Sequence, residues 1–291
     1  YNKFFFFIFV FIFAKIIFLK YQYFDKNIFK QETEFFIYEN TSFDSLFFEL
    51  DSLFIDTHPL AKLYLKQFFY QKRLDYWYKP GRYVFPAFSS LNDVVNKIRS
   101  RSQDPVNVTF NSMDEIFPIF DIMGSSLELD SIDIINYLNN INYPLDSLYL
   151  LFIPNTYEIF WDISPKNLFE RIQNEYQIFW NKSRIIAAKK NNLSKHEVFI
   201  LASIVDKEAS HFDEMPRIAG LYINRLEKDW VLAADPTIVY IWRNQYGQNL
   251  RRIRNKHIEL TKLSKFNTYH NKNLPPFPIC VPSFQAIHAV L

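Results

Sequence analysis

The amino-terminal segment is apolar at every position from Phe4 to Leu19 except Lys15. Sixteen helical residues span about 24 Å, slightly less than the roughly 30 Å hydrocarbon core of a bilayer. Lys15 lies near the carboxyl end of the run, where a long side chain can reach the interface. No small-residue cleavage site follows, which favours a retained anchor over a removed signal peptide. We therefore predict a transmembrane helix within residues 1–24; the alternative is a very apolar buried helix.

The next part of the chain, residues 25–105, has the pattern of a stalk followed by a small module. A strand is expected near 34–38, and one or two helices over 43–70 with Pro59 at a helix start. Pro80-Gly81 is a turn signal before a β-prone run, and residues 89–100 have apolar positions at helical spacing. Residues 106–110 form another expected strand.

The remainder, residues 106–291, reads as a larger α+β domain. Helices are expected over 112–123, 130–140, 165–190, 195–211 and 216–228. The Asp-Pro-Thr at 235–237 is expected to be a turn before a β-prone run. The four prolines in 266–283 exclude a regular helix there. The predicted fold class is thus α+β, with an anchor, a small module and a larger mixed domain.

Two acids follow the apolar run 198–205. Ser194 and Glu197 form a capping box, so a helix begins near 195. Its apolar stripe continues through Val205 to Phe212, and Glu208 falls on that stripe, whereas Asp206 falls off it. Glu208 is therefore expected to face the core or a cleft and Asp206 to be a solvated surface residue. A carboxyl among apolar groups has a raised pKa, which suits a general acid; the alternative is an acid that pairs with a basic neighbour.

A second group of polar residues lies in the last third of the chain. Asn267, Thr268 and Tyr269 offer hydrogen bonds and one aromatic ring, which is the chemistry of a sugar-binding wall. The alternative is an ordinary proline-rich surface loop. The basic run 251–257 is either a solvated face or a contact for carboxylates on an acidic ligand.

Composition narrows the classes of function. The chain has 291 residues, a net charge of +2 and one cysteine, Cys280. One cysteine excludes an intramolecular disulfide and any site with several cysteine ligands. The histidines are scattered and no HExxH or glycine-rich phosphate loop occurs, so we expect no metal and no cofactor. The mild charge and sparse aromatic interleaving of the basic run argue against nucleic acid as a partner.

Several of these motifs occur together and in a characteristic order. LASIVDKEAS, IAGLYINRL, LAADPT, FNTY and LPPFPICVPS resemble the endolytic murein transglycosylase (YceG-like) family, as does FIPNTYEIFW at 152–161. KPGRYVF and the following helix resemble that family's small LysM-like module. The resemblance covers nearly the whole chain after residue 30.

The resemblance implies a single-pass protein of the inner membrane with its body in the periplasm. The lysines after the apolar run would alone place the body in the cytoplasm, so the orientation comes from the family and not from charge. The implied reaction cleaves peptidoglycan between MurNAc and GlcNAc inside the strand and leaves a 1,6-anhydro-MurNAc end. The implied partners are glycan strands, the inner membrane and cell-wall synthases.

The resemblance also suggests roles for individual residues. It makes Glu208 the general acid and base, and it places Asn267, Thr268, Tyr269, Asp235, Thr237 and Asn224 near the glycan. One carboxyl suffices because the 6-hydroxyl of the sugar, and not water, attacks C1.

The sequence departs from the family pattern at several positions. Ala233 replaces a usual glutamine, Asn273 and Phe277 replace usual glycines, and a β-rich tail is expected after Leu291. Phe277 would be strained by roughly 1–2 kcal/mol if its φ were positive, whereas Asn273 tolerates that conformation. These departures motivate an alternative function, a catalytically inactive peptidoglycan-binding or scaffold protein. A third hypothesis is a hydrolase that uses Glu208, Asp235 and water.

Overall fold

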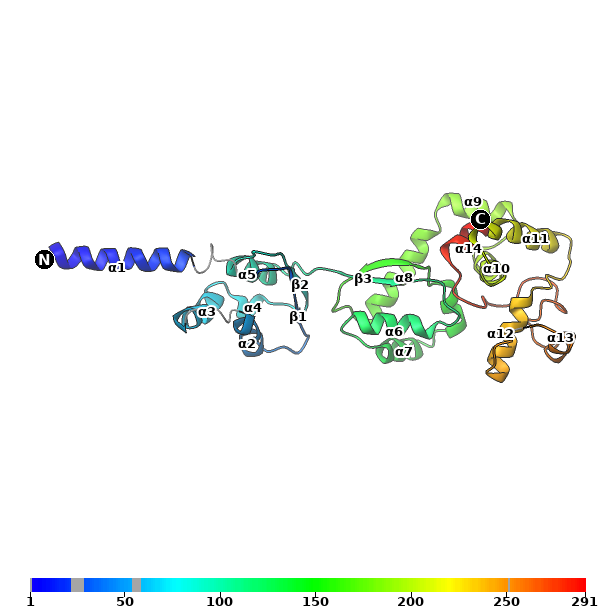
Figure 1. Cartoon of the computed structure of the whole chain (residues 1–291), viewed down its shortest axis with the longest axis horizontal. Helices are drawn as coiled ribbons and strands as arrows, with labels where there is room; N and C mark the ends of the chain where they lie inside the picture. The colour runs from blue at the N-terminus through cyan, green and yellow to red at the C-terminus, as the bar shows by residue number, and fades with distance from the viewer. Residues whose placement is uncertain (1, 22–28, 54–58, 251) are drawn as a thin grey trace. The chain divides into compact units, whose positions relative to one another are not determined.

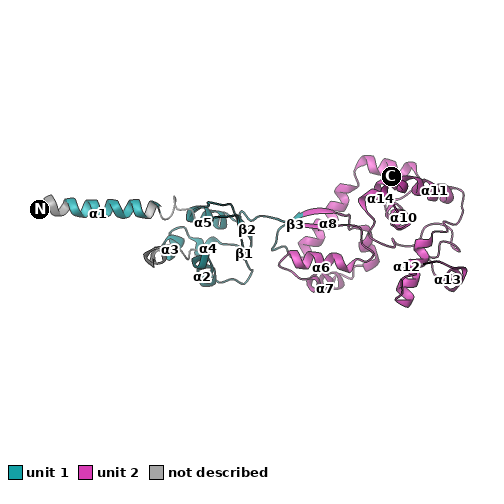
Figure 2. Ribbon diagram, viewed as in Figure 1, with its two compact units in different colours: residues 1–106, 158–163 teal, residues 107–157, 164–291 magenta. Residues whose placement is uncertain are grey.

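The computed structural model describes residues 2–21, 29–53, 59–250 and 252–291 (Figure 1). These residues form two compact units, which are described separately. Residues 1–106 and 158–163 make up the first unit, and residues 107–157 and 164–291 make up the second (Figure 2). The first unit therefore includes a short segment from the middle of the chain.

The apolar amino-terminal run forms helix α1 (Asn2–Lys20), as its composition predicted. Within the described residues, no helix combines the length and the apolar character needed to cross a membrane. The structure therefore does not support the predicted transmembrane anchor. Residues 22–28, which hold the end of the expected anchor and the start of the expected stalk, lie outside the described residues.

The first unit contains a two-stranded antiparallel sheet and several helices. β1 (Thr33–Ile37) pairs with β2 (Gly81–Phe85), with Phe35 opposite Tyr83. The helices of this unit after α1 are α2 (Phe43–Leu53), α3 (Pro59–Gln71), α4 (Leu74–Trp77) and α5 (Leu91–Arg99). Alternate residues of β2 are buried against the apolar face of α5, as its helical spacing predicted.

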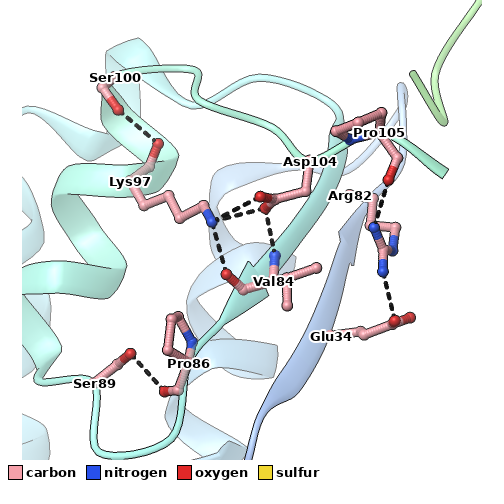
Figure 3. Close-up of polar contacts among 9 residues, drawn as sticks. All are labelled: Glu34, Arg82, Val84, Pro86, Ser89, Lys97, Ser100, Asp104 and Pro105. Atoms are coloured by element: carbon pink, nitrogen blue, oxygen red, sulfur yellow. Dashed lines mark hydrogen bonds and ion pairs between the residues drawn. The ribbon is translucent and has the colours of Figure 1, made fainter. Parts of the chain in front are cut away.

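Charged side chains connect β2, α5 and the segment that follows α5. Asp104 accepts a hydrogen bond of 2.7 Å from the Val84 amide, and the Lys97 ammonium donates to the Val84 carbonyl (2.7 Å) and to Asp104 (3.0 Å). Arg82 donates to Glu34 and to the Pro105 carbonyl (Figure 3). The backbone amide and carbonyl of Val84, on the edge of β2 that does not pair with β1, thus have side-chain hydrogen-bond partners.

A second sheet is formed by β3 (Val106–Phe110) and β4 (Asn155–Ile159), and most of its residues belong to the second unit. Phe110 stacks on Tyr157 with ring centroids 5.2 Å apart. The first helical elements of the second unit are α6 (Phe117–Ser126), α7 (Ser131–Asn140), the 3₁₀ turn η2 (Leu145–Leu150) and α8 (Pro165–Phe179). The expected helix over 165–190 is two helices, because α8 ends at Phe179 and Asn181 caps a new one.

The remaining elements of the second unit include one largely buried helix. They are α9 (Lys182–Lys190), α10 (Lys195–Glu208), the 3₁₀ turn η3 (Phe212–Glu214), α11 (Met215–Glu227), α12 (Asp235–Tyr246), α13 (Asn255–Leu260) and α14 (Phe284–Val290). Helix α10 packs against α11, α12 and α14. The expected β-prone run after Asp235 is wrong, since that run is α12. Pro236 is well placed in its first turn, and Thr237, Ile238 and Ile241 are buried at helical spacing.

Candidate active site

Helix α10 carries the two candidate acids in its last turn. The Ser194 hydroxyl accepts a hydrogen bond from the Glu197 amide (3.2 Å), and the Glu197 carboxylate accepts one from the Ser194 amide (2.8 Å). This capping box starts the helix where the sequence predicted. The helix ends at Glu208, because Ala209 adopts an extended backbone. The predicted end at residue 211 is therefore three residues too late.

Asp206 is not the solvated residue that the apolar stripe predicted. It is half-buried, and its carboxylate accepts hydrogen bonds from the Ser112 hydroxyl (2.6 Å) and from the amide and hydroxyl of Ser283. Asp206 lies in the wall of a pocket of about 880 Å³ that does not include Glu208. Its carboxylate therefore connects α10 to two distant segments of the chain.

Glu208 lies in the wall of a different pocket, with a volume of about 730 Å³. Although the residue is exposed by surface area, the surrounding atoms desolvate its carboxyl enough to raise its pKa. The negative charge of Asp235 raises it further, while a hydrogen bond from Tyr222 and the charge of Arg225 oppose the rise. A carboxyl that keeps its proton to higher pH than usual is suited to donate it.

The raised pKa of Glu208 has a consequence for stability. The folded state holds this proton to higher pH than the unfolded state, so stability falls as pH rises through the folded pKa. We expect Glu208→Gln to be more stable than the wild type at neutral pH. The difference should disappear below the ordinary glutamate pKa of 4.5, where the Glu208 carboxyl is protonated in both the folded and the unfolded protein. Thermal unfolding of the two proteins across this pH range measures it, and an equal difference at all pH values would contradict the shift.

Asp235, the first residue of α12, also lines this pocket. Its Oδ1 atom accepts a hydrogen bond of 2.5 Å from the Tyr269 hydroxyl. Burial and this bond raise the pKa of Tyr269 to about 12, so the phenol remains a donor at neutral pH. The structure thus brings together Glu208, Asp235 and Tyr269 from three separate segments of the sequence.

Three other residues predicted to bind substrate are buried and have partners inside the protein. Asn267 donates to the Ile258 carbonyl (2.9 Å) and to the Thr261 hydroxyl (3.0 Å), and its own oxygen accepts from the Tyr269 amide. Thr237 and Thr268 share a hydroxyl hydrogen bond of 2.8 Å. These side chains are fully buried, so the structure does not support their predicted direct contact with a glycan. Their hydrogen bonds instead fix the backbone that carries Asp235 and Tyr269.

The last predicted contact, Asn224, is exposed on α11 and is not among the described residues that line the Glu208 pocket. Of the departures from the family pattern, Phe277 has no positive φ, so the strain considered for it is absent. Ala233 has a φ of 50° and Asn273 a φ of 66°. The Ala233 conformation is held by a hydrogen bond from its amide to the Thr268 carbonyl (2.8 Å).

Sequence reasoning pointed to the basic run that contains Arg252, but it missed the ion pairs of Lys207 and Arg243 in this pocket. Asp114 forms ion pairs with Lys207 (2.5 Å) and with Arg243 (2.8 Å). Burial alone would raise the pKa of Asp114, but the hydrogen bonds and charges of the two cations outweigh it and keep the pKa low. Asp114 is far from both partners in the sequence, and no local pattern indicated this contact.

A carboxyl with a raised pKa beside a second carboxylate in an open pocket is typical of an enzyme that uses general acid and base catalysis. The model of the YceG-like family matches residues 35–291, so the chain belongs to that family. The match reaches residue 291 and does not support the predicted absence of a carboxyl-terminal part. It covers the small module without giving separate support for a LysM-like character.

Two curated relatives share a limited segment with this chain. An endolytic murein transglycosylase of Bacillus subtilis (strain 168) is 34% identical over 103 residues, which are 35% of this chain and 27% of that protein. A protein of the same description from Streptococcus pneumoniae serotype 2 (strain D39) is 34% identical over 101 residues, which are 35% of this chain and 18% of that protein. The matched segment therefore spans about a quarter or less of each relative.

A solved structure supports the fold. A crystal structure of a yceG-like protein from Listeria monocytogenes aligns with a TM-score of 0.50 and 21% identity, covering 90% of both chains. At this identity the likeness bears on the fold alone.

Proposed function

We propose that this protein is a lytic transglycosylase that cleaves peptidoglycan glycan strands internally and leaves 1,6-anhydro-MurNAc ends. The observation that carries the proposal is Glu208, whose carboxyl has a raised pKa in an open pocket beside Asp235. Membership of the YceG-like family and the names of the curated relatives support the same substrate class. The proposed site of action is outside the cytoplasm, where peptidoglycan lies.

In the proposed reaction, Glu208 transfers its proton to the glycosidic oxygen while the bond from that oxygen to C1 of MurNAc breaks. The 6-hydroxyl of the same sugar then bonds to C1 and returns its proton to Glu208. No water enters the product, and the acid ends the cycle protonated. The charge of Asp235 raises the pKa of Glu208 beforehand, and it also stabilises positive charge that develops near C1.

The nearness of Asp235 also motivates hydrolysis as a second candidate function. If Asp235 activated a water molecule, both carboxyls would act as they do in ordinary glycosidases. The two reactions differ in their products, since only hydrolysis places an oxygen atom from water at the new reducing end.

The experiment incubates the full chain with uncrosslinked glycan strands in ¹⁸O-labelled water and reads the new ends by mass spectrometry. Internal cuts with unlabelled 1,6-anhydro ends would support the transglycosylase. Labelled reducing ends would establish the hydrolase instead. A folded protein that binds the strands and makes no cut would be an inactive binding or scaffold protein, and the proposed function would be wrong.

The hydrogen bond between Tyr269 and Asp235 allows a finer test of the site. We expect Tyr269→Phe to lower kcat about 5- to 10-fold, because a single charge-assisted hydrogen bond that positions Asp235 is lost. Without the donated hydrogen bond, the Asp235 charge is less compensated and repels the Glu208 charge more, so the basic limb of the pH–rate profile should move to higher pH. Tyr246→Phe removes an exposed hydroxyl from the end of α12 and serves as the control. An unchanged pH profile in Tyr269→Phe would contradict the positioning role.

A further inference from the structure

The pocket that contains Glu208 extends along one face of α12. Asp235, Val239 and Arg243 line it at intervals of four residues, which places them in a row on the same side of the helix. Eight residues of α-helix correspond to about 12 Å along the axis. Along this wall, the backbone of Arg243 is therefore about two helical turns from that of Asp235.

The cations of the pocket differ in their partners. Lys207 and Arg243 both pair with Asp114, which leaves one anion for two cations. Arg252, from the basic run 251–257, is exposed in the lining of the same pocket. Among the residues that the structure describes, no carboxylate forms an ion pair with Arg252. Its guanidinium is thus available to a ligand.

The balance of charge around the pocket depends on Glu208. Three cations, Lys207, Arg243 and Arg252, and three carboxyls, Asp114, Glu208 and Asp235, line it. Because the proposed acid must hold its proton before the reaction, the pocket carries a net charge of +1 in the reactive state. The excess positive charge lies towards Arg252, whose charge no described residue neutralises. An anionic group of the substrate is therefore favoured there.

We propose that Arg252, assisted by Arg243, binds a carboxylate of the peptidoglycan strand and makes the enzyme selective for strands that carry it. This inference rests on the proposed function. GlcNAc carries no charge, so the anion comes from the muramyl units, either from their peptide stems or from the lactyl carboxylate that remains when a stem is removed. A planar guanidinium is suited to a carboxylate because it can donate two parallel hydrogen bonds.

The test compares Arg252→Gln with the wild type on stem-bearing strands and on strands stripped by an amidase. We expect KM on stem-bearing strands to rise about 5- to 10-fold with little change in kcat, because the contact lies away from the scissile bond and near solvent. Arg252→Lys should recover part of the loss, since it keeps the charge and loses the two-point geometry. Arg217→Gln removes an exposed charge of α11 outside the described pocket lining and is the matched control.

The outcomes separate the two sources of the carboxylate. A loss confined to stem-bearing strands supports recognition of a stem carboxylate. A loss confined to stripped strands, which alone carry a free lactyl carboxylate, supports recognition of that group. A neutral oligomer of N-acetylglucosamine should bind equally well to the variant and the wild type. Unchanged KM on both kinds of strand, or weaker binding of the neutral oligomer, would overturn the proposal.

The failure of the proposed function would be recognised separately. Binding of stem-bearing strands is measured by itself, without cleavage. If the wild type cuts no strand, but Arg252→Gln binds stem-bearing strands more weakly than the wild type does, the proposed enzymatic function is wrong and the carboxylate site is supported. If the wild type cuts strands and Arg252→Gln changes neither cleavage nor binding, the proposed function is supported and the carboxylate site is wrong.

Discussion

Replacing Glu208 with Gln is expected to lower the rate of glycan cleavage by about 10²- to 10⁴-fold, the usual contribution of a general acid or base. Gln has nearly the same size as Glu but cannot give a proton to the glycosidic oxygen. The side chain is exposed in the pocket wall, so the variant should fold and keep its affinity for strands. The measurement is the initial rate of formation of 1,6-anhydro ends, with kcat and KM determined separately.

The matched control for this prediction is Glu227→Gln, which removes the charge of an exposed glutamate at the end of α11. Its rate should equal that of the wild type. Because the acid acts in the chemical step, the loss in Glu208→Gln should be in kcat and not in KM. If Glu208→Gln kept more than a tenth of the wild-type rate, another group would be the acid and the proposed mechanism would be wrong.

The start of α10 was predictable from the sequence, whereas the surroundings of its two acids were not. The Ser194 and Glu197 signal is local, because a capping box involves residues three apart. The stripe that assigned Asp206 to solvent relied on Phe212, which lies beyond the end of the helix and is 66% exposed. The run 198–205 is buried all round, so the apolar pattern could not distinguish one side of the helix from another.

The helix α12 illustrates a second limit of local reasoning. Its β-branched residues favour a strand when considered alone, but helix and strand cannot be separated by such a short apolar run. Tertiary packing favours the helix over a strand here, because a helix buries Ile238 and Ile241 on one side while another side lines the pocket. The contacts from Ser112 to Asp206 and from Asp114 to Lys207 join residues more than ninety positions apart, which no periodicity reveals.

The largest effect on stability is expected from Asn267→Ala. The Asn267 amide is fully buried and makes three hydrogen bonds, two donated and one accepted. Alanine would leave the Ile258 carbonyl, the Thr261 hydroxyl and the Tyr269 amide without these partners. We expect unfolding to become easier by about 2–4 kcal/mol, because buried polar groups that lose their partners carry a desolvation cost. Thermal unfolding and amide exchange across 258–271 measure the loss, with the exposed Asn140→Ala as control.

This variant also distinguishes a buried supporting residue from one that touches the glycan. If Asn267 contacted the strand, its replacement would weaken binding and leave the unfolding midpoint unchanged. If it supports the backbone of Tyr269, exchange at the Tyr269 amide should accelerate, and activity should fall through the loss of the bond from Tyr269 to Asp235. Activity lost without any change in stability or exchange would contradict the supporting role.

The same logic extends to Thr268, which accepts a hydrogen bond from the Ala234 amide (3.0 Å) next to Asp235. Buried polar residues around this pocket therefore affect catalysis by fixing the backbone that carries its exposed acids.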